Sequence, residues 1–396
     1  MIPVSKWAAA IQPSATLAAG AKARQLKAEG KIVFDFSLGE PDFNTPKHIC
    51  EAAHQAMLAG HTHYTAANGI PELRSAIARW YKRNYSFEFA PDQVIVSNGA
   101  KHSIHNALVA IVGPGDEVLI PAPYWVSYSD LVLMTGATYK LIPSTEESGF
   151  KITPAQLKAA IGPNSKLLML NSPSNPTGSV YTRAELEALA DVVLDSKLAV
   201  MSDEIYEQLV YGDAKATCFA TLRPGLAERT VTISGVSKSY AMTGWRMGWT
   251  VGPLPVVKAM GTVQSQETSN PSSISQHATI AALEGNQACV ADMRKEFAAR
   301  RDLVCKRLNE LPGIRCPIPD GAFYAFFNVS SFFGKSLKGK TIADSASFCA
   351  AALETVHVNL VQGSAFGMEG YVRLSFATNR DTLAKGLDKL EEFLQG

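Results

Sequence analysis

The middle of the chain alternates short, near-continuous apolar runs with segments of helical periodicity. Apolar runs rich in β-branched residues are typical of strands that are buried on both faces of a sheet. The helical patterns between them, such as Arg183–Asp195, predict helices that cover those faces. We therefore expect an α/β fold built on a mostly parallel, doubly wound sheet. The predicted strands are Gln93–Ser97, Glu117–Ile120, Leu167–Leu170, Leu198–Met201 and Thr230–Ile233.

The pattern changes from about residue 286 onward. A long charged helical pattern, Met293–Leu308, is followed by two segments that predict strands, Gly321–Phe327 and Tyr371–Phe376. These elements indicate a smaller α+β domain. The predicted division is an N-terminal segment of residues 1–45 that joins the small domain, a large domain of residues 46–285 and a small C-terminal domain of residues 286–396.

Polar or aromatic side chains follow all five predicted strands. Ligands of open α/β sheets bind beyond the carboxyl ends of parallel strands, and these ends meet at one edge. Any one of the segments is compatible with an ordinary loop, but five together indicate a binding site at that edge. The segments are Ser97-Asn-Gly-Ala-Lys101, Pro121-Ala-Pro-Tyr-Trp125, Asn171–Gly178, Ser202–Tyr206 and Ser234–Lys238.

Lys238 follows an apolar strand and lies among small residues, which is unusual for a solvated surface lysine. Burial and nearby cations lower the pKa of a lysine, so that its neutral amine can form a covalent bond with a carbonyl. Arg246, eight residues later among glycines, can contribute to that cationic field and can pair with a phosphate. Together the two residues indicate covalent attachment of pyridoxal phosphate (PLP).

Four more residues can serve the same cofactor, and each also has an ordinary structural explanation. Asp203 can keep the pyridine nitrogen of PLP protonated, or it can cap a helix. Tyr206 lies on the same side of a helical turn as Asp203 and can hydrogen-bond the ring oxygen, as Asn175 also can. The alternatives are that Tyr206 is a tyrosine at the edge of the core and that Asn175 belongs to an Asn-Pro turn. Trp125 can stack on the pyridine ring, or it can belong to the core.

Gly99 and Arg373 are candidates for anion binding. A glycine between a strand and a helix pattern lets backbone N–H groups approach a phosphate at the helix N-terminus, although such junctions are common. Arg373 lies in an alternating apolar strand and must therefore face a partner. That partner is either a substrate carboxylate or the carboxylate of a buried internal salt bridge.

Composition narrows the classes of function. Of the 396 residues, 46% are hydrophobic and 18% charged, which is typical of a soluble globular protein large enough for two domains. A net charge of +1 favours neither nucleic acid nor a membrane surface, and no apolar run approaches the roughly 18 residues that span a bilayer. Six scattered cysteines without a C-x-x-C pair, and no apolar signal-peptide stretch, predict a reduced cytoplasmic chain without a metal site.

Two other classes of protein are disfavoured by what the chain lacks. No G-x-G-x-x-G follows an early strand, which argues against a dinucleotide-binding dehydrogenase. The nearly neutral charge and the lack of an appended basic domain argue against a non-enzymatic module that binds a partner or DNA.

In the order and spacing of its motifs, the chain resembles the class I aminotransferases of PLP fold type I, and most of all their bacterial aspartate aminotransferase branch. The resemblance covers nearly the whole length, and it implies a mostly parallel seven-stranded sheet between helices plus the smaller α+β domain. The spacings from Lys238 to Arg246 and from Asp203 to Tyr206 are its most specific features. The motifs that carry it are Pro13-Ser-Ala-Thr, Gly39-Glu-Pro-Asp, Tyr64–Arg74, Asn175-Pro-Thr-Gly, Ser202–Tyr206, Ser237–Arg246, Gly321-Ala-Phe-Tyr and Val372-Arg-Leu-Ser.

The resemblance implies that Lys238 is the Schiff-base lysine and the base of a 1,3-proton shift. Its implied cofactor contacts are Asp203 at the pyridine nitrogen, Tyr206 and Asn175 at the ring oxygen, Trp125 on the ring, and Gly99, Ala100, Lys101 and Arg246 around the phosphate. It also implies a homodimer with shared active sites, in which Tyr64 reaches the phosphate of the neighbouring subunit. Its implied substrate contacts are Gly39, Trp125, Asn175 and Arg373, the last through the α-carboxylate.

Two features depart from the most common family pattern. Many relatives carry a hydroxyl residue three positions before the lysine, where this chain has Gly235; Ser234 or Ser237 can compensate. Enzymes of the other aspartate branch read the distal carboxylate with a partner-subunit arginine, and Gln264–Gln276 contains no arginine. Lys101 resembles the substitute that this branch uses.

The expected reaction is a ping-pong transfer of the amino group from L-aspartate to 2-oxoglutarate. Some relatives that also accept prephenate carry a lysine near Pro13-Ser-Ala-Thr, where this chain has Gln12, so prephenate ranks below aspartate. Aromatic, kynurenine or alanine-type substrates stay open as well, as does another PLP reaction such as that of a C–S lyase.

Overall fold

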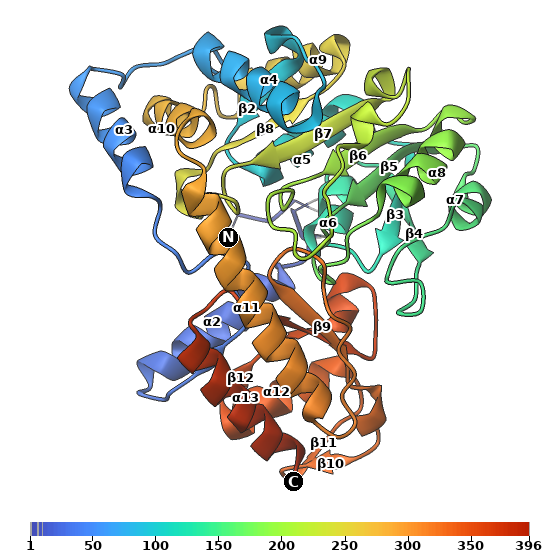
Figure 1. The fold of residues 1–396 in the computed structure, drawn as a ribbon. Helices are drawn as coiled ribbons and strands as arrows, with labels where there is room; N and C mark the ends of the chain where they lie inside the picture. Colours follow the sequence, from blue (N-terminus) through green and yellow to red (C-terminus); the bar gives the residue numbers. More distant parts are fainter. Residues whose placement is uncertain (1, 6–7, 10, 396) are drawn as a thin grey trace.

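The computed structural model describes residues 2–5, 8–9 and 11–395. Residues 1, 6–7 and 10 of the predicted N-terminal segment, and residue 396 of the predicted small domain, lie outside this description. A large part with a broad sheet and a smaller part are joined by the long helix α11, Ala288–Glu310 (Figure 1).

The centre of the large part is a seven-stranded sheet with the order β2-β8-β7-β6-β5-β3-β4. Strand β8 pairs antiparallel with both of its neighbours, and the other pairings of this sheet are parallel. The predicted mostly parallel α/β fold is therefore confirmed. The strands are β2 (Val94–Ser97), β3 (Glu117–Ala122), β4 (Thr138–Pro143), β5 (Ser165–Asn171), β6 (Ala199–Asp203), β7 (Thr230–Gly235) and β8 (Gly248–Val251).

Strands β4 and β8 are absent from the five strands predicted by sequence, and each has a physical reason. Strand β4 lies at the sheet edge and is largely solvent-exposed, so it lacks a continuous apolar run. Strand β8 is buried but short, and it begins with Gly248, two residues after the end of the Lys238–Arg246 motif. Its strand character comes from pairing with β2 and β7, which lie far away in the sequence.

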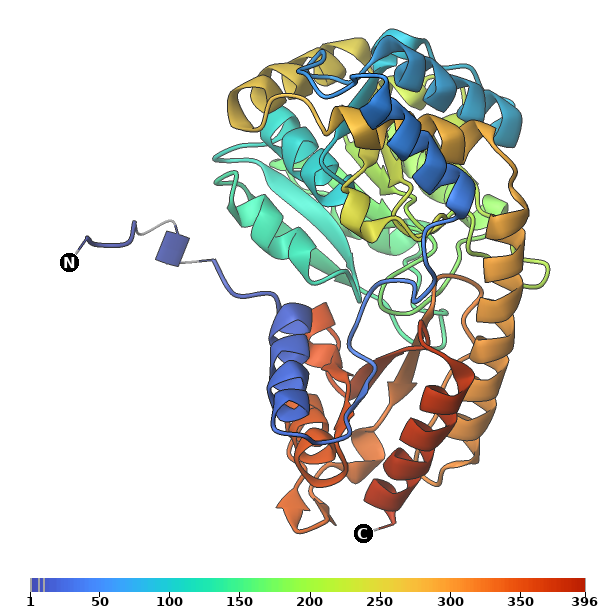
Figure 2. The ribbon, with the colours of Figure 1, turned by 90° about the vertical axis from the view of Figure 1, so that its left-hand side faces the viewer.

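Helices bury both faces of the sheet (Figures 1 and 2), and alternate side chains of one strand enter different cores. In β2, for example, Ile95 packs in one cluster and Val94 and Val96 in another. One face is covered by α5 (Ala100–Ile111), α6 (Ser127–Leu133) and α9 (Leu254–Glu267). The other is covered by α3 (Lys47–Leu58), α4 (Pro71–Tyr85), α7 (Pro154–Ala160), α8 (Arg183–Leu194) and α10 (Ser273–Glu284).

The smaller part is an α+β unit that includes the N-terminal segment. Its three-stranded antiparallel sheet has the order β13-β14-β9, and strand β1 pairs parallel with β12. Its strands are β1 (Phe34–Asp35), β9 (Tyr324–Asn328), β10 (Ser336–Leu337), β11 (Lys340–Thr341), β12 (Val358–Asn359), β13 (Val361–Gln362) and β14 (Tyr371–Ser375). Its helices are α2 (Ala15–Ala28), α12 (Ser345–Val356) and α13 (Arg380–Leu394), with most of α11. The boundaries after residues 45 and 285 stay predictions.

No helix in the described part of the chain is long and apolar enough to cross a membrane.

Strand β8 packs unusually closely beneath the start of α5. A Cβ placed on Gly248 would lie 2.3 Å from the backbone nitrogen of Ala100 and 2.5 Å from the carbonyl carbon of Gly99. Both neighbours are backbone atoms, which cannot rotate away as a side chain can. The absence of a side chain at position 248 thus fixes the start of α5 at the carboxyl edge of the sheet.

We expect Gly248→Ala to destabilise the protein by about 1–3 kcal/mol, because the new methyl group overpacks two backbone segments. Gly244→Ala is the matched control: a Cβ at Gly244 meets no atom within 4 Å, and the change should stay within about 0.5 kcal/mol. Urea denaturation followed by circular dichroism measures both. Equal stability of the two variants would contradict this account of the packing.

Candidate active site

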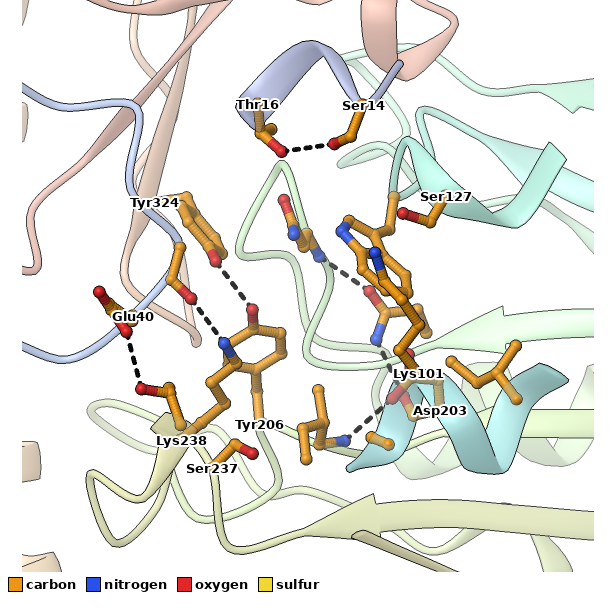
Figure 3. A pocket seen from close by; sticks show the side chains of 18 of the residues that line it. Ser14, Thr16, Glu40, Lys101, Ser127, Asp203, Tyr206, Ser237, Lys238 and Tyr324 are labelled. Atoms are coloured by element: carbon orange, nitrogen blue, oxygen red, sulfur yellow. Dashed lines mark hydrogen bonds between the residues drawn. The ribbon is translucent and has the colours of Figure 1, made fainter. Parts of the chain in front are cut away.

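A cavity of about 390 Å³ lies at the carboxyl edge of the large sheet, where the smaller part and the N-terminal segment meet it (Figure 3). Its volume suits a small ligand. The structure brings the following predicted site residues to its wall: Gly39, Ala100, Lys101, Trp125, Asn175, Asp203, Tyr206, Lys238, Arg246 and Arg373.

Lys238 lies in the turn that follows the fully buried strand β7. Its Nζ donates a hydrogen bond to the carbonyl of Gly39 at 2.5 Å and lies 6.0 Å from the ring centre of Tyr206 (Figure 3). The pKa of Lys238 is lowered to about 8, first by burial and then by the charges of Arg246 and Arg373, while Glu40 and Asp203 oppose the shift. The neutral amine is therefore accessible near physiological pH.

Asp203 ends strand β6 and is almost fully buried. Its Oδ2 accepts a hydrogen bond from the Tyr128 hydroxyl at 2.6 Å, and its Oδ1 accepts one from the backbone N–H of Ile205 at 3.2 Å. Burial raises the pKa of Asp203 to about 6, although both hydrogen bonds and the charge of Lys238 favour the ionised form. No salt bridge reaches Asp203 from the described residues, and such a buried carboxylate is suited to a cationic N–H entering from the cavity.

Arg373 in strand β14 is 1% exposed and has no carboxylate partner in the described part of the chain. Its Nη1 donates to Oδ1 of Asn175 at 2.9 Å, its Nη2 donates to the carbonyl of Ser37 at 2.7 Å, and its Nε is unpaired. The guanidinium lies 4.5 Å from the ring centre of Tyr324. The described residues therefore do not form the internal salt bridge that the sequence left open, and this buried cation is suited to bind an anion.

A hydrogen-bonded network joins the remaining polar groups. The hydroxyls of Tyr206 and Tyr324 lie 2.8 Å apart (Figure 3). The backbone N–H of Asn175 donates to Oδ1 of Asn171, whose Nδ2 donates to the carbonyl of Asp203. The ends of β5 and β6 are thereby held in register with the loop that carries Asn175.

The N-terminus of α5 and Arg246 form a cradle suited to a phosphate. Gly99 caps α5 with a φ of 87°, and a Cβ there would lie 2.4 Å from Nη2 of Arg246. Arg246 donates from Nη1 to the carbonyl of Thr243 and has no carboxylate partner among the described residues. Anions bind at helix N-termini because the first N–H groups lack partners within the helix.

Ser234 and Gly235 clarify the departure from the common family pattern. The structure does not bring Ser234 to the cavity; it is buried, and its hydroxyl donates to Oε2 of Glu207 at 3.0 Å. A side chain at Gly235 would lie 2.7 Å from the carbonyl oxygen of Met247, so a hydroxyl residue has no room there without a shift of β8. Ser237, in contrast, lines the cavity beside Lys238 (Figure 3).

Lys101 and Trp125 lie together on one side of the cavity. The Nζ of Lys101 is 4.9 Å from the ring centre of Trp125, whose ring packs edge-on against Tyr128 at 5.4 Å. Burial, and then the charge of Arg246, lower the pKa of Lys101.

Tyr64 is 90% exposed and does not line this cavity, so its contact with a neighbouring subunit stays a prediction.

Several residues of the cavity region had no role assigned from sequence. Tyr128 binds Asp203, Tyr324 binds Tyr206, and the carbonyl of Ser37 binds Arg373. Tyr324 lies within the Gly321-Ala-Phe-Tyr motif, so the sequence did contain a motif that could have identified it as a site residue. Tyr128 had none beyond its position three residues after Trp125, and a backbone carbonyl such as that of Ser37 carries no signal in the side-chain sequence.

Two carboxyl groups lie buried near Asp203. Glu204 accepts hydrogen bonds from Ser202 Oγ and the backbone N–H of Phe219, and Glu207 accepts one from Ser234. Burial raises the pKa of Glu204 to about 7 and that of Glu207 to about 8. Among the described residues, no group of histidine, cysteine or acidic side chains could hold a metal ion.

Comparisons with known proteins agree with this geometry. The family model described as aminotransferase class I and II matches residues 31–390. An aspartate/prephenate aminotransferase of Cereibacter sphaeroides is 48% identical over 395 residues, and an aspartate aminotransferase of Geobacillus stearothermophilus is 45% identical over 392; each match covers 99% of both chains.

Solved structures have the same fold over the whole chain. The aspartate aminotransferase from Rhizobium meliloti is 42% identical with a TM-score of 0.97, covering 100% of this chain and 99% of that one. The aspartate aminotransferase from Thermus thermophilus with maleate is 38% identical with a TM-score of 0.93, covering 99% of this chain and 100% of that one.

The raised pKa of Glu207 makes stability depend on pH. An unfolded glutamate has a pKa of about 4.3, so folding keeps a proton that the unfolded chain loses, and stability falls as pH rises toward about 8. We expect Glu207→Gln, which keeps the acceptor for Ser234, to gain melting temperature relative to wild type between about pH 5 and about pH 9.

Thermal melts across this range measure the difference. Glu204→Gln should show the same trend, complete by about pH 8, because the pKa of Glu204 is raised to about 7. A difference between Glu207→Gln and wild type that is constant with pH would contradict the assignment.

Proposed function

Because the chain belongs to the class I and II aminotransferase family, we propose that it transfers the amino group of L-aspartate to 2-oxoglutarate, giving oxaloacetate and L-glutamate. The chain is a PLP-dependent aminotransferase. The two half-reactions would follow one another at the same site, so that the first product leaves before the second substrate enters.

The observation that carries the proposal is the unpaired charge of Arg373 in the cavity that also holds Lys238. A planar guanidinium binds a carboxylate through two parallel hydrogen bonds. Every amino donor and 2-oxo acid acceptor of this reaction has a carboxylate beside the reacting carbon. Binding it at Arg373 would direct that carbon toward Lys238.

The residues around the cavity fit PLP. Asp203 would hold the pyridine nitrogen, Tyr206 and Asn175 the ring oxygen, and Trp125 the ring face. Gly99, Ala100, Lys101 and Arg246 would surround the phosphate, and Ser237 rather than Ser234 has its side chain on the cavity. When bound, PLP supplies a carbonyl that links to the amino group and a ring that withdraws electrons from the reacting carbon.

The chain itself supplies the proton transfers and the orientation. The amine of Lys238 would hold the cofactor at rest. It would then take the proton from Cα of the substrate and deliver it to the cofactor carbon. Its pKa of about 8 suits a group that must both accept and donate a proton. The ionised form of Asp203 would stabilise positive charge on the facing nitrogen.

Lys101 is the proposed reader of the second carboxylate. Its ammonium faces the cavity beside Trp125, and no carboxylate pairs with it among the described residues. Arg373 and Lys101 together would match a dicarboxylate such as aspartate or 2-oxoglutarate. A substrate with a neutral side chain would leave the ammonium of Lys101 partly buried without an anion, which favours acidic substrates.

We further propose a cytoplasmic homodimer with shared active sites, in which Tyr64 reaches the neighbouring subunit. The exposed ring of Tyr64, outside the cavity of its own chain, supports that arrangement. Six cysteines free of disulfides support a reducing compartment. The smaller part, with Ser14 and Thr16 at the cavity wall, would close over bound substrate and exclude water.

Prephenate is a second candidate amino acceptor. Relatives at 48%, 45% and 44% identity carry aspartate/prephenate names, one of them marked as probable. Prephenate has the same α-keto acid group for Arg373 and a second carboxylate for the cationic wall. Gln12, in place of a lysine, remains the reason to rank it below aspartate.

We expect the purified enzyme to use aspartate with a higher kcat/KM than aromatic, kynurenine or alanine donors, with 2-oxoglutarate as acceptor. Lys238→Ala should lower the rate by more than about 10³-fold because it removes both the covalent anchor and the proton carrier. Steady-state assays over the donor panel, with prephenate tested as an acceptor, measure this. Near wild-type transamination by Lys238→Ala would contradict the assigned chemistry.

We expect Lys101→Ala to lower kcat/KM for aspartate by about 10–100-fold, because one charged hydrogen bond to the distal carboxylate is lost. The rate with alanine should change by less than about threefold, since alanine has no such carboxylate and the backbone N–H of residue 101 remains. The two donors therefore control for each other. An equal loss on both would show that Lys101 serves the cofactor or the fold instead.

A further inference from the structure

The segment Ser37–Thr45 crosses from the smaller part to the large sheet and touches the Lys238–Arg246 loop at several points. Thr45 Oγ1 donates to the carbonyl of Ala241 at 2.7 Å and accepts from Trp245 Nε1 at 2.9 Å. These contacts anchor the Thr45 end of the crossing segment. The opposite end, near Ser37, bears the residues that reach the cavity.

Glu40 is the acidic residue near the Ser37 end. Its Oε2 accepts a hydrogen bond from the Thr243 hydroxyl at 2.7 Å, and it lies at the cavity wall near Lys238 (Figure 3). The preceding residue, Gly39, gives its carbonyl to Nζ of Lys238. The carbonyl of Thr243 in turn accepts from Arg246. One short hydrogen-bonded path therefore joins Glu40, the lysine loop and the phosphate cradle.

The charges around the cavity make Glu40 distinctive. The described residues of its wall include four cationic side chains and two carboxylates. The cations are Lys101, Lys238, Arg246 and Arg373, and the carboxylates are Asp203 and Glu40. Asp203 is buried at the sheet and bound by Tyr128, whereas Glu40 lies on the crossing segment beside the carbonyl that holds the lysine.

We propose that Glu40 is a positioning residue for Lys238: fixed by Thr243, it holds the segment whose Gly39 carbonyl binds the amine, and it places a negative charge on that segment at the cavity wall. This inference rests on the role proposed for Lys238. It assigns to Glu40 the position that the amine takes while it is not bonded to the cofactor. The amine leaves that position when it carries a proton to or from the substrate.

Other charged and titratable groups face Lys238 from each neighbouring element. Arg246 on its own loop and Arg373 on β14 favour the neutral amine, and Asp203 at the end of β6 favours the ammonium. The ring of Tyr206 lies 6.0 Å away. Of the charged groups, Glu40 has the largest effect, and it raises the pKa of Lys238 against the lowering by burial.

Glu40→Gln isolates the charge, because the amide oxygen still accepts the hydrogen bond from Thr243. The full-length protein freed of PLP is trace-labelled with acetic anhydride across a range of pH, and the Lys238 peptide is quantified by mass spectrometry. We expect the midpoint of Lys238 labelling to fall by at least about half a pH unit, because the ammonium loses a nearby negative charge. Glu29→Gln, at an exposed carboxylate paired with Lys31, is the control and should leave the midpoint unchanged.

Thr243→Val tests positioning separately, because it keeps the carboxylate and removes its hydrogen bond. Labelling of Lys238 at high pH should become faster as the Gly39 carbonyl is held less firmly, and Thr243→Ser should restore the wild-type rate. A wild-type midpoint in Glu40→Gln would overturn the charge role, and equal rates in the Thr243 variants would overturn the positioning role. Failure of wild type to transaminate aspartate would overturn the proposed reaction and leave this titration unaffected.

Discussion

Unpaired charges are held around one cavity, and most of the scaffold serves to keep them there. Among the described residues, Arg373 is buried without a carboxylate partner and Asp203 is buried without a salt bridge, while Lys238 loses much of its preference for the ammonium form. Each arrangement is unfavourable for the protein alone and becomes favourable when a ligand of complementary charge binds. The binding energy of substrate and cofactor can therefore contribute to orientation and proton transfer.

The two parts of the molecule divide this task. Parallel strands bring Asp203 and the Lys238 loop to one edge, and the α5 N-terminus completes that edge over Gly248. The smaller part contributes Arg373, whose strand belongs to a different sheet. Helix α11 connects them: Val290 packs in a core of the large part, whereas Phe297 and Val304 pack in the core of the smaller one. Arg373 and Lys238 therefore share a cavity although they belong to separate sheets.

Much of this arrangement could be predicted from sequence, because strand ends and charged residues within apolar strands carry local signals. Lys238, Asp203 and Arg373 are of this kind, and the structure gathers all three at one cavity. Ser234 is different, since only the pairing of β7 and its packing show that its hydroxyl binds Glu207. The Gly39 carbonyl and Tyr128 depend on long-range backbone placement, and strand β8 depends on its partners; local patterns contain none of this.

The most direct test of the account is a single half-reaction. The purified enzyme with bound PLP is mixed with L-aspartate in the absence of any 2-oxo acid, and oxaloacetate is quantified. We expect a burst of about one oxaloacetate per subunit, no further turnover, and renewed formation when 2-oxoglutarate is added. Continuous release of ammonia or pyruvate without an acceptor, or no oxaloacetate at all, would contradict the proposed transamination of aspartate.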